Sequence, residues 1–171
     1  GLLSQSRGEL DATVARMVAA IRYRGPDDSG IWSDPAAGVG LGHARLSILD
    51  LSPEGHQPMS SCSGRYVLSY NGEVYNFGEL RSELEAAGTT FRGRSDTEVM
   101  LAAFDAWGIE TSVKRLVGMF AFAVWDNHTQ TLTLGRDRLG EKPLYYGWQG
   151  QTFLFGSELK SLKAHPAFRA E

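Results

Sequence analysis

The segment Met119–Asp126 constrains the fold of this chain most, because it alternates large and small side chains and has no polar face. A strand that faces water on one side carries polar residues at every second position. A strand without a polar face is typical of the interior of a layered domain, where other layers cover both sides of the sheet. We therefore predict a strand buried on both faces, inside a layered domain of helices and strands.

Shorter segments on both sides of it predict further strands and amphipathic helices. Strands are expected at 31–32, 39–48, 65–70, 89–92, 131–135, 144–148 and 152–155. Helices are expected at 10–21, 77–87, 95–107 and 109–116, and from Ser157, which is expected to be an N-cap. Glycines at 38, 40 and 42 leave one face of a strand bare, so that another backbone or a ligand can approach. About eight strands in two runs predict an α+β fold, a four-layer αββα sandwich of two antiparallel sheets covered by helices.

The composition argues against several classes of partner. The 171 residues have a net charge of −3 and no basic run, so nothing indicates nucleic acid or an anionic membrane. No apolar run approaches the roughly 18 residues of a membrane-spanning helix. We expect no signal peptide and take a cytoplasmic location as the default. Cys62 is the single cysteine and has no neighbouring base, so we expect it to take no part in chemistry.

The octapeptide Ser69–Asn76 follows an apolar, β-branched run and contains Asn71-Gly72, so the strand is expected to end there in a turn. One interpretation is a hairpin, since Asn-Gly is the commonest hairpin signal. The other is a binding site, in which the Asn71 amide and the Gly72 N–H stabilise an oxyanion and the Glu73 carboxylate holds an ammonium. This segment alone leaves both interpretations open.

Other polar residues also have a structural and a functional interpretation. Arg45, at the end of a strand, needs either an acidic partner in a structural salt bridge or an anionic ligand. Asp96, at the start of an apolar helix, either caps that helix or turns outward to hold an ammonium, leaving Ser95 as the cap. His43 is expected to be a packed core histidine, and the charged loop 136–140 to be a structural network.

Six motifs, taken together, are more specific than any one of them. They are Arg24-Gly25-Pro26-Asp27, Arg45-Leu46-Ser47-Ile48, Tyr70–Asn76, Ser95-Asp96-Thr97-Glu98, Gly118–Phe122 and Arg138–Leu144. In this order they resemble the glutaminase domain of glutamine-hydrolysing asparagine synthetases, which are class II glutamine amidotransferases with the N-terminal-nucleophile hydrolase fold. The resemblance runs from Gly1 to about Pro166, so residues 1–171 are expected to form one such domain. The Leu-Ser-Ile after Arg45 favours the asparagine synthetase branch over glucosamine-6-phosphate synthase and the purine-pathway amidotransferase.

The resemblance implies roles for individual residues. Arg45 is expected to bind the α-carboxylate of glutamine, and Glu73 and Asp96 its α-ammonium. Asn71 and Gly72 are expected to form the oxyanion hole. Leu46 and Ile48 belong to the same substrate-binding motif. A guanidinium suits a carboxylate, and neutral donors suit a developing alkoxide, so the chemistry agrees with the resemblance.

The resemblance also implies a nucleophile that precedes Gly1. The family begins with Cys-Gly-Ile-Ala-Gly, whose cysteine attacks the substrate while its own α-amino group acts as the base. Gly1 aligns with the last glycine, so about four residues, roughly 13 Å of strand, are expected upstream. Gly1-Leu2-Leu3 already has the pattern of the middle of a strand, which favours this expectation. A chain that begins at Gly1 is expected to be inactive, because Cys62 cannot replace that cysteine.

The implied activity is hydrolysis of glutamine to glutamate and ammonia through a cysteinyl thioester. The ammonia is expected to reach a C-terminal synthetase domain that amidates aspartate to asparagine with ATP and Mg²⁺. No cofactor or metal is expected within residues 1–171, and a homodimer is expected from the family alone. Two alternatives stay open: a catalytically inert scaffold, as in β-lactam-synthetase-like relatives, or an amidotransferase that serves another acceptor.

Overall fold

The computed structural model describes residues 7–46 and 55–169. The expected strand fragment at Gly1–Leu3 and the motif residue Ile48 lie outside these ranges. The helices are α1 (Arg7–Ala19), η1 (Arg22–Arg24), α2 (Phe77–Ala86), α3 (Asp96–Trp107), α4 (Ile109–Arg115) and α5 (Leu159–Lys163). The strands are β1 (Asp28–Asp34), β2 (Val39–Arg45), β3 (Met59–Ser60), β4 (Tyr66–Val74), β5 (Gly118–Asp126), β6 (Thr131–Arg136), β7 (Tyr145–Gln149) and β8 (Thr152–Gly156).

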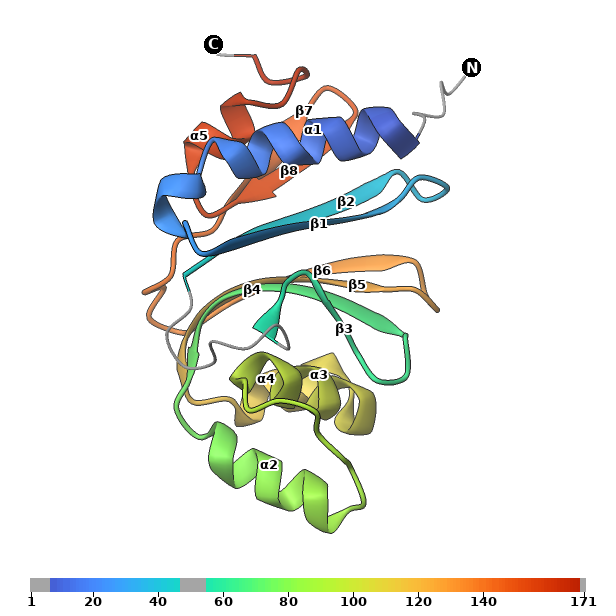
Figure 1. The fold of residues 1–171 in the computed structure, drawn as a ribbon, viewed down its shortest axis with the longest axis vertical. Helices are drawn as coiled ribbons and strands as arrows, with labels where there is room; N and C mark the ends of the chain where they lie inside the picture. Colours follow the sequence, from blue (N-terminus) through green and yellow to red (C-terminus); the bar gives the residue numbers. More distant parts are fainter. Residues whose placement is uncertain (1–6, 47–54, 170–171) are drawn as a thin grey trace.

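These elements stack in four layers (Figure 1). Helices α1 and α5 cover the hairpins β1–β2 and β7–β8, which face a four-stranded sheet of order β3-β4-β5-β6. Helices α2, α3 and α4 lie on the far side of that sheet. Every strand pair is antiparallel. The predicted α+β, αββα architecture is therefore confirmed.

Strand β5 lies in the centre of this stack, as its sequence predicts. It pairs with β4 on one side and β6 on the other, and its residues from Phe120 to Asp126 are all buried. On its α3 side, Phe122 packs against Phe104 with ring centroids 5.7 Å apart. On the opposite side, Ala123 and Trp125 join a small core shared with the hairpin layer.

The bare glycine face of β2 is occupied by helix α1. A Cβ on Gly40 would lie 2.5 Å from Val14 Cγ2, and one on Gly42 would overlap Val18 Cγ2. Both valines are buried in the interface between helix and strand. The glycine alternation thus lets a helix approach the sheet closely, one of the outcomes expected for such a face.

Three local predictions are wrong. The strand expected at 89–92 does not form, because backbone donors there bond elsewhere: Thr89 N–H donates to Leu84 O, which closes α2, and Arg92 N–H donates to Glu98 Oε1 at 2.7 Å. Helix α5 starts after Glu158, whose backbone is extended, so Ser157 is not its N-cap. The strand through Asn71-Gly72 does not end in a turn, and β4 continues to Val74.

Within residues 7–46 and 55–169, no helix is long and apolar enough to cross a membrane. The same part of the chain contains no cluster of three or more histidine, cysteine, aspartate or glutamate side chains arranged to hold a metal ion.

Candidate functional site

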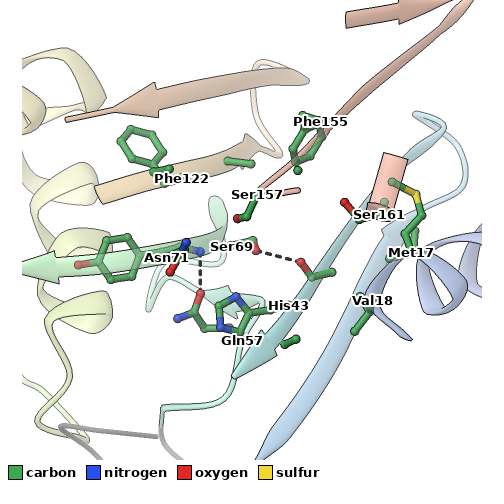
Figure 2. Close-up of a pocket in the computed structure, with 18 of the residues that line it drawn as sticks. Met17, Val18, His43, Gln57, Ser69, Asn71, Phe122, Phe155, Ser157 and Ser161 are labelled. Atoms are coloured by element: carbon green, nitrogen blue, oxygen red, sulfur yellow. Dashed lines mark hydrogen bonds between the residues drawn. The ribbon is translucent and has the colours of Figure 1, made fainter. Parts of the chain in front are cut away.

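A cavity of about 1110 Å³ lies between the hairpin layer and the four-stranded sheet. Among its lining residues are six of the seven predicted site residues: Arg45, Leu46, Asn71, Gly72, Glu73 and Asp96. They come from the end of β2, the end of β4 and the start of α3. Figure 2 shows Asn71 and Ser69 of β4 near His43 of β2, and the Ser69 hydroxyl donates to Gly42 O of β2 at 3.1 Å. The structure thus brings residues from three distant motifs to one cavity.

Gly72 lies inside β4, opposite Phe120 of β5. A Cβ on Gly72 would overlap the backbone oxygen of Met119, so a side chain here would push the two strands apart. The Asn-Gly pair therefore marks a close approach of neighbouring backbones instead of a turn.

The pairing also sets the direction of the Gly72 N–H. The N–H and C=O of one residue in an antiparallel strand point to the same side. Phe120 N–H donates to Asp137 Oδ2 at 3.1 Å, and Phe120 O accepts from Asp137 N at 2.8 Å, so both groups point away from β4. Gly72, opposite Phe120, correspondingly points its N–H away from β5.

The same edge of β4 carries the N–H groups of Tyr70 and Val74, because the direction repeats every second residue. Tyr70 N–H donates to Gln57 Oε1 at 2.7 Å. Val74 N–H donates to Asp96 Oδ2 at 3.0 Å. The Gly72 N–H therefore points to the same edge, between these two occupied donors, and Gly72 lines the cavity.

Asp96 is the first residue of α3 and is buried. Ser95 caps the helix, since its Oγ accepts from Glu98 N–H at 3.3 Å. Asp96 instead faces β4, where its Oδ2 accepts from the Tyr70 hydroxyl at 2.6 Å and from Val74 N–H. Of its two interpretations, capping of α3 is excluded.

Arg45 ends β2 opposite Asp28 of β1. Its guanidinium packs against Gly55, where a Cβ would overlap Arg45 Nη2. The nearby His56 hydrogen bond, together with the charge of Arg45, lowers the pKa of Asp28 below its usual range. The charge of Arg45 therefore helps to lower the pKa of a neighbouring carboxyl, and Arg45 also lines the cavity.

His43 lines the cavity two residues before Arg45 and is half-buried. Burial, with a smaller contribution from the Arg45 charge, lowers the pKa of His43 from 6.5 to about 4. The imidazole is therefore neutral near pH 7, but it lies half-buried at the cavity and not in the packed core expected from the sequence.

The loop after β6 is not a network of charge pairs. Asp137 is buried, and its carboxylate accepts backbone N–H groups from Phe120, Leu139, Glu141 and Lys142. Burial alone would raise the pKa of Asp137, but the backbone donors outweigh it and hold the pKa at about 2. The loop is therefore organised by one carboxylate, and it carries Lys142 to the cavity.

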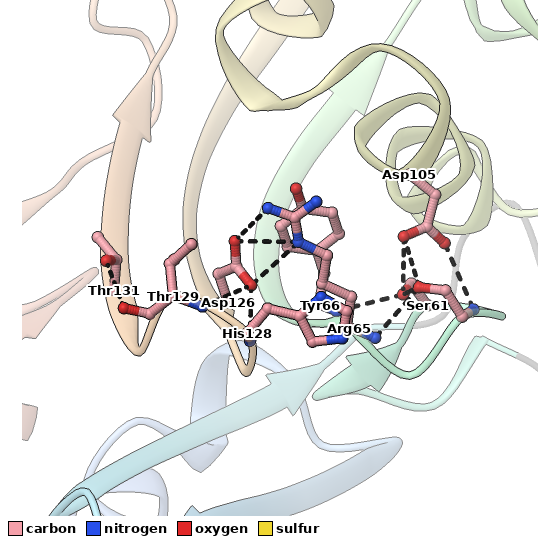
Figure 3. A network of polar contacts seen from close by, with 9 residues as sticks. Ser61, Arg65, Tyr66, Asp105, Asp126, His128, Thr129 and Thr131 are labelled. Atoms are coloured by element: carbon pink, nitrogen blue, oxygen red, sulfur yellow. Dashed lines mark hydrogen bonds and ion pairs between the residues drawn. The ribbon is translucent and has the colours of Figure 1, made fainter.

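Cys62 lies on an exposed turn at another part of the molecule. Ser61 and Ser63 beside it bond to Asp105 of α3, and Arg65 forms a two-pronged ion pair with Asp126 of β5 (Figure 3). Arg65 holds the pKa of Asp126 well below its usual range. This network is structural, and Cys62 is not among the residues that line the cavity.

Sequence reasoning missed two residues of the site. Gln57 is buried, and its side chain joins Tyr70 N–H to the Thr97 hydroxyl, at 2.7 and 3.4 Å. Tyr70 looks like an ordinary core aromatic, since no local pattern indicates that its hydroxyl meets Asp96, far along the chain. Nothing in the sequence around Gln57 indicates that it belongs to the site.

Comparisons with known proteins agree on one family. The family model described as a glutamine amidotransferase domain matches residues 1–171. The chain is 46% identical over 161 residues to asparagine synthetase (glutamine-hydrolysing) 3 of Bacillus subtilis, covering 92% of this chain and 25% of that protein. It is 44% identical over 149 residues to asparagine synthetase (glutamine-hydrolysing) 1 of the same organism, covering 87% of this chain and 23% of that protein. The chain thus spans about a quarter of the length of these relatives.

The fold has solved counterparts as well. Glutamine phosphoribosylpyrophosphate amidotransferase from B. subtilis, solved with ADP and GMP, superimposes with a TM-score of 0.77 at 22% identity. The match covers 90% of this chain and 40% of that one, and at this identity it supports the fold alone.

Proposed function

Because the chain belongs to the glutamine amidotransferase domain family, we propose that it hydrolyses glutamine to glutamate and ammonia. The observation that carries this proposal is the convergence of Arg45, Asn71, Gly72, Glu73 and Asp96 on one cavity. A cation, two carboxylates and neutral donors are the groups that an α-amino acid amide requires.

In this proposal the two ends of glutamine are held by different elements. The Arg45 guanidinium at the end of β2 binds the α-carboxylate, as its planar fork of donors suits. Glu73 and Asp96 bind the α-ammonium. Leu46 and Ile48, which follow Arg45 in the sequence, belong to the same substrate-binding motif. The γ-amide then lies beside Asn71 and Gly72, and the Gly72 N–H, which points away from β5 at the cavity, supports their role as the oxyanion hole.

The chemistry runs through an N-terminal cysteine that precedes Gly1 in the mature protein. Its thiolate attacks the γ-carbonyl carbon, and Asn71 and Gly72 stabilise the oxyanion. The tetrahedral intermediate collapses to a γ-glutamyl thioester, and the protonated amide nitrogen leaves as ammonia. Water then attacks the thioester, which releases glutamate and restores the thiol. The α-amino group, whose ordinary pKa is about 7.7–8.0, relays the proton. Without that cysteine the domain is inactive.

The ammonia is then used to amidate an acceptor that a larger protein binds. We propose that residues 1–171 are the glutaminase domain of a cytoplasmic asparagine synthetase, and that a C-terminal synthetase domain amidates aspartate with ATP and Mg²⁺. The identity to two asparagine synthetases supports this acceptor. A homodimer is part of the same proposal. The glutaminase reaction itself requires no cofactor.

Replacement of Arg45 by alanine in the complete protein tests the proposal. The variant lacks the guanidinium that binds the α-carboxylate. Because a charged hydrogen-bonding partner is removed, glutamine-dependent asparagine synthesis should fall at least about a hundredfold. Synthesis from added ammonium should stay near the wild-type rate, because ammonium bypasses the cavity. Both rates are measured as asparagine formed per enzyme.

Arg92→Ala is the matched control, because Arg92 is an exposed arginine that does not line the cavity. It should leave both rates unchanged. If Arg45→Ala lowers the two rates equally, Arg45 supports the structure and does not bind glutamine.

A further inference from the structure

The Tyr70 hydroxyl makes a contact that the proposed chemistry does not use. Tyr70 lies on β4, one residue before Asn71, and is only 4% exposed. Its hydroxyl donates to Asp96 Oδ2 at 2.6 Å, within a buried environment. Burial, followed by the neighbouring charge of Asp96, raises the pKa of Tyr70 far above its usual range. The phenol therefore stays protonated and acts only as a donor to the carboxylate.

This contact restricts which Asp96 oxygen a substrate can meet. Oδ2 accepts from both Tyr70 and Val74 N–H, and in the described part of the chain every hydrogen bond to the Asp96 carboxylate goes to this oxygen. Two donors at one oxygen fix the plane of the carboxylate. Asp96 lines the cavity, so Oδ1 is the atom left to bind a cation there.

Hydrogen bonds at the backbone of Tyr70 also hold this residue in place. Its N–H donates to Gln57 Oε1, and Gln57 Nε2 donates to the Thr97 hydroxyl, next to Asp96. Gln57 and Thr97 are both buried. Gln57 therefore joins β4 to Thr97 on one side of the Tyr70–Asp96 bond, and the bond from Val74 N–H to Asp96 joins them on the other. These contacts leave the phenol little freedom to move.

We propose that Tyr70 is a positioning residue that orients Asp96 toward the α-ammonium of the substrate and thereby selects α-amino amides over amides that lack the amino group. The proposal rests on the proposed glutaminase function. It assigns Tyr70 no contact with the reacting amide. Its effect is therefore expected in substrate selection, not in the chemical step.

The test compares glutamine with 4-carbamoylbutanoate, which is glutamine without its α-amino group. Ammonia release from both is measured with the complete protein carrying Tyr70→Phe. The change should lower kcat/KM for glutamine about tenfold, mainly through KM, because a hydrogen bond to a charged group is lost. The slower reaction of 4-carbamoylbutanoate should stay within about twofold of wild type, since it carries no ammonium for Asp96 to bind. Partial loss of folded protein scales both rates equally and cancels in their ratio.

Tyr66→Phe is the matched control. Tyr66 is a buried tyrosine on the same strand, and its hydroxyl makes no hydrogen bond within the described residues. It should leave the ratio of the two substrates unchanged. If Tyr70→Phe also leaves the ratio unchanged, or lowers both rates alike, the positioning role is wrong.

Asp96→Asn separates this inference from the function on which it rests. The proposed function predicts that Asp96→Asn strongly reduces glutamine hydrolysis and spares 4-carbamoylbutanoate. If it does so while Tyr70→Phe shows no selective effect, only the inference about Tyr70 is overturned. If Asp96→Asn affects both substrates alike, the assignment of Asp96 to the α-ammonium fails, and the Tyr70 proposal fails with it.

Discussion

Single residues set the charge of the cavity wall. His43 is neutral beside the permanent charge of Arg45, since burial keeps the pKa of His43 near 4. In the proposed function, a second cation at this point would repel the α-ammonium of glutamine. The neutral imidazole therefore adds no positive charge beside Arg45, while Glu73 and Asp96 bring carboxylates to the same cavity.

The pKa of His43 predicts how stability depends on pH. An unfolded chain binds a proton at His43 near pH 6.5, but the folded protein does so only near pH 4. Between these values the unfolded state carries more protons, so stability rises with pH and is lost as the pH falls. The free energy of unfolding is measured with denaturant above pH 6.5 and near pH 4. Between these values, wild type should lose about 1–3 kcal/mol more of it than His43→Asn does. Equal losses in the two proteins would contradict a His43 that stays neutral in the folded protein.

At this scale the sequence identified candidates but not their contacts. The types and motif positions of Arg45, Glu73 and Asp96 were sufficient to name them, and most of the named residues line one cavity. The partners of Asp96 were not predictable, because Tyr70 and Val74 precede it by 26 and 22 residues. A local pattern near a helix start favours capping, whereas the folded chain brings a strand edge to the same carboxylate.

At the scale of elements, the edge of β4 beyond β3 organises the site. Strand β3 pairs with β4 at Val67 and Leu68. Further along, Gln57 and Asp96 occupy the donors of Tyr70 and Val74 and leave the Gly72 N–H between them. Asn71-Gly72 indicated a turn because local signals contain no information on the neighbouring strand. The β5 backbone decides the outcome, and a glycine is required where the two strands come close.

The packing of α1 on β2 gives a prediction at the same scale. Gly42→Ala should destabilise the protein by about 1–3 kcal/mol, because the new methyl group overpacks a close interface. The added Cβ would overlap Val18 Cγ2 on α1. Val18→Ala should restore part of this loss, and urea unfolding of the single and double variants measures the coupling.

Gly147→Ala is the matched control for that cycle, since nothing lies within 4 Å of a Cβ built on Gly147 of β7. It should change stability little. If Gly42→Ala is as well tolerated as Gly147→Ala, then α1 does not pack on β2 as described.

At the scale of the whole molecule, the family predicted from the ordered motifs is confirmed by a family model that covers residues 1–171. The four layers are confirmed as well. They were predictable because the apolar pattern of β5 reflects burial on both faces, and burial leaves a periodic pattern in the sequence. The cavity between the layers was not predictable from periodicity. It depends on how the hairpins β1–β2 and β7–β8 are spaced over the central sheet, and long-range packing decides that spacing.

The most direct test of the account is to locate the thiol that reacts inside this cavity. The complete protein is treated with an electrophilic glutamine analogue, with and without excess glutamine, and its peptides are analysed by mass spectrometry. The account predicts one label, on an N-terminal cysteine a few residues before Gly1, which glutamine suppresses while Cys62 stays unmodified. An N-terminus without cysteine, or labelling that glutamine does not suppress, would contradict the proposed glutaminase.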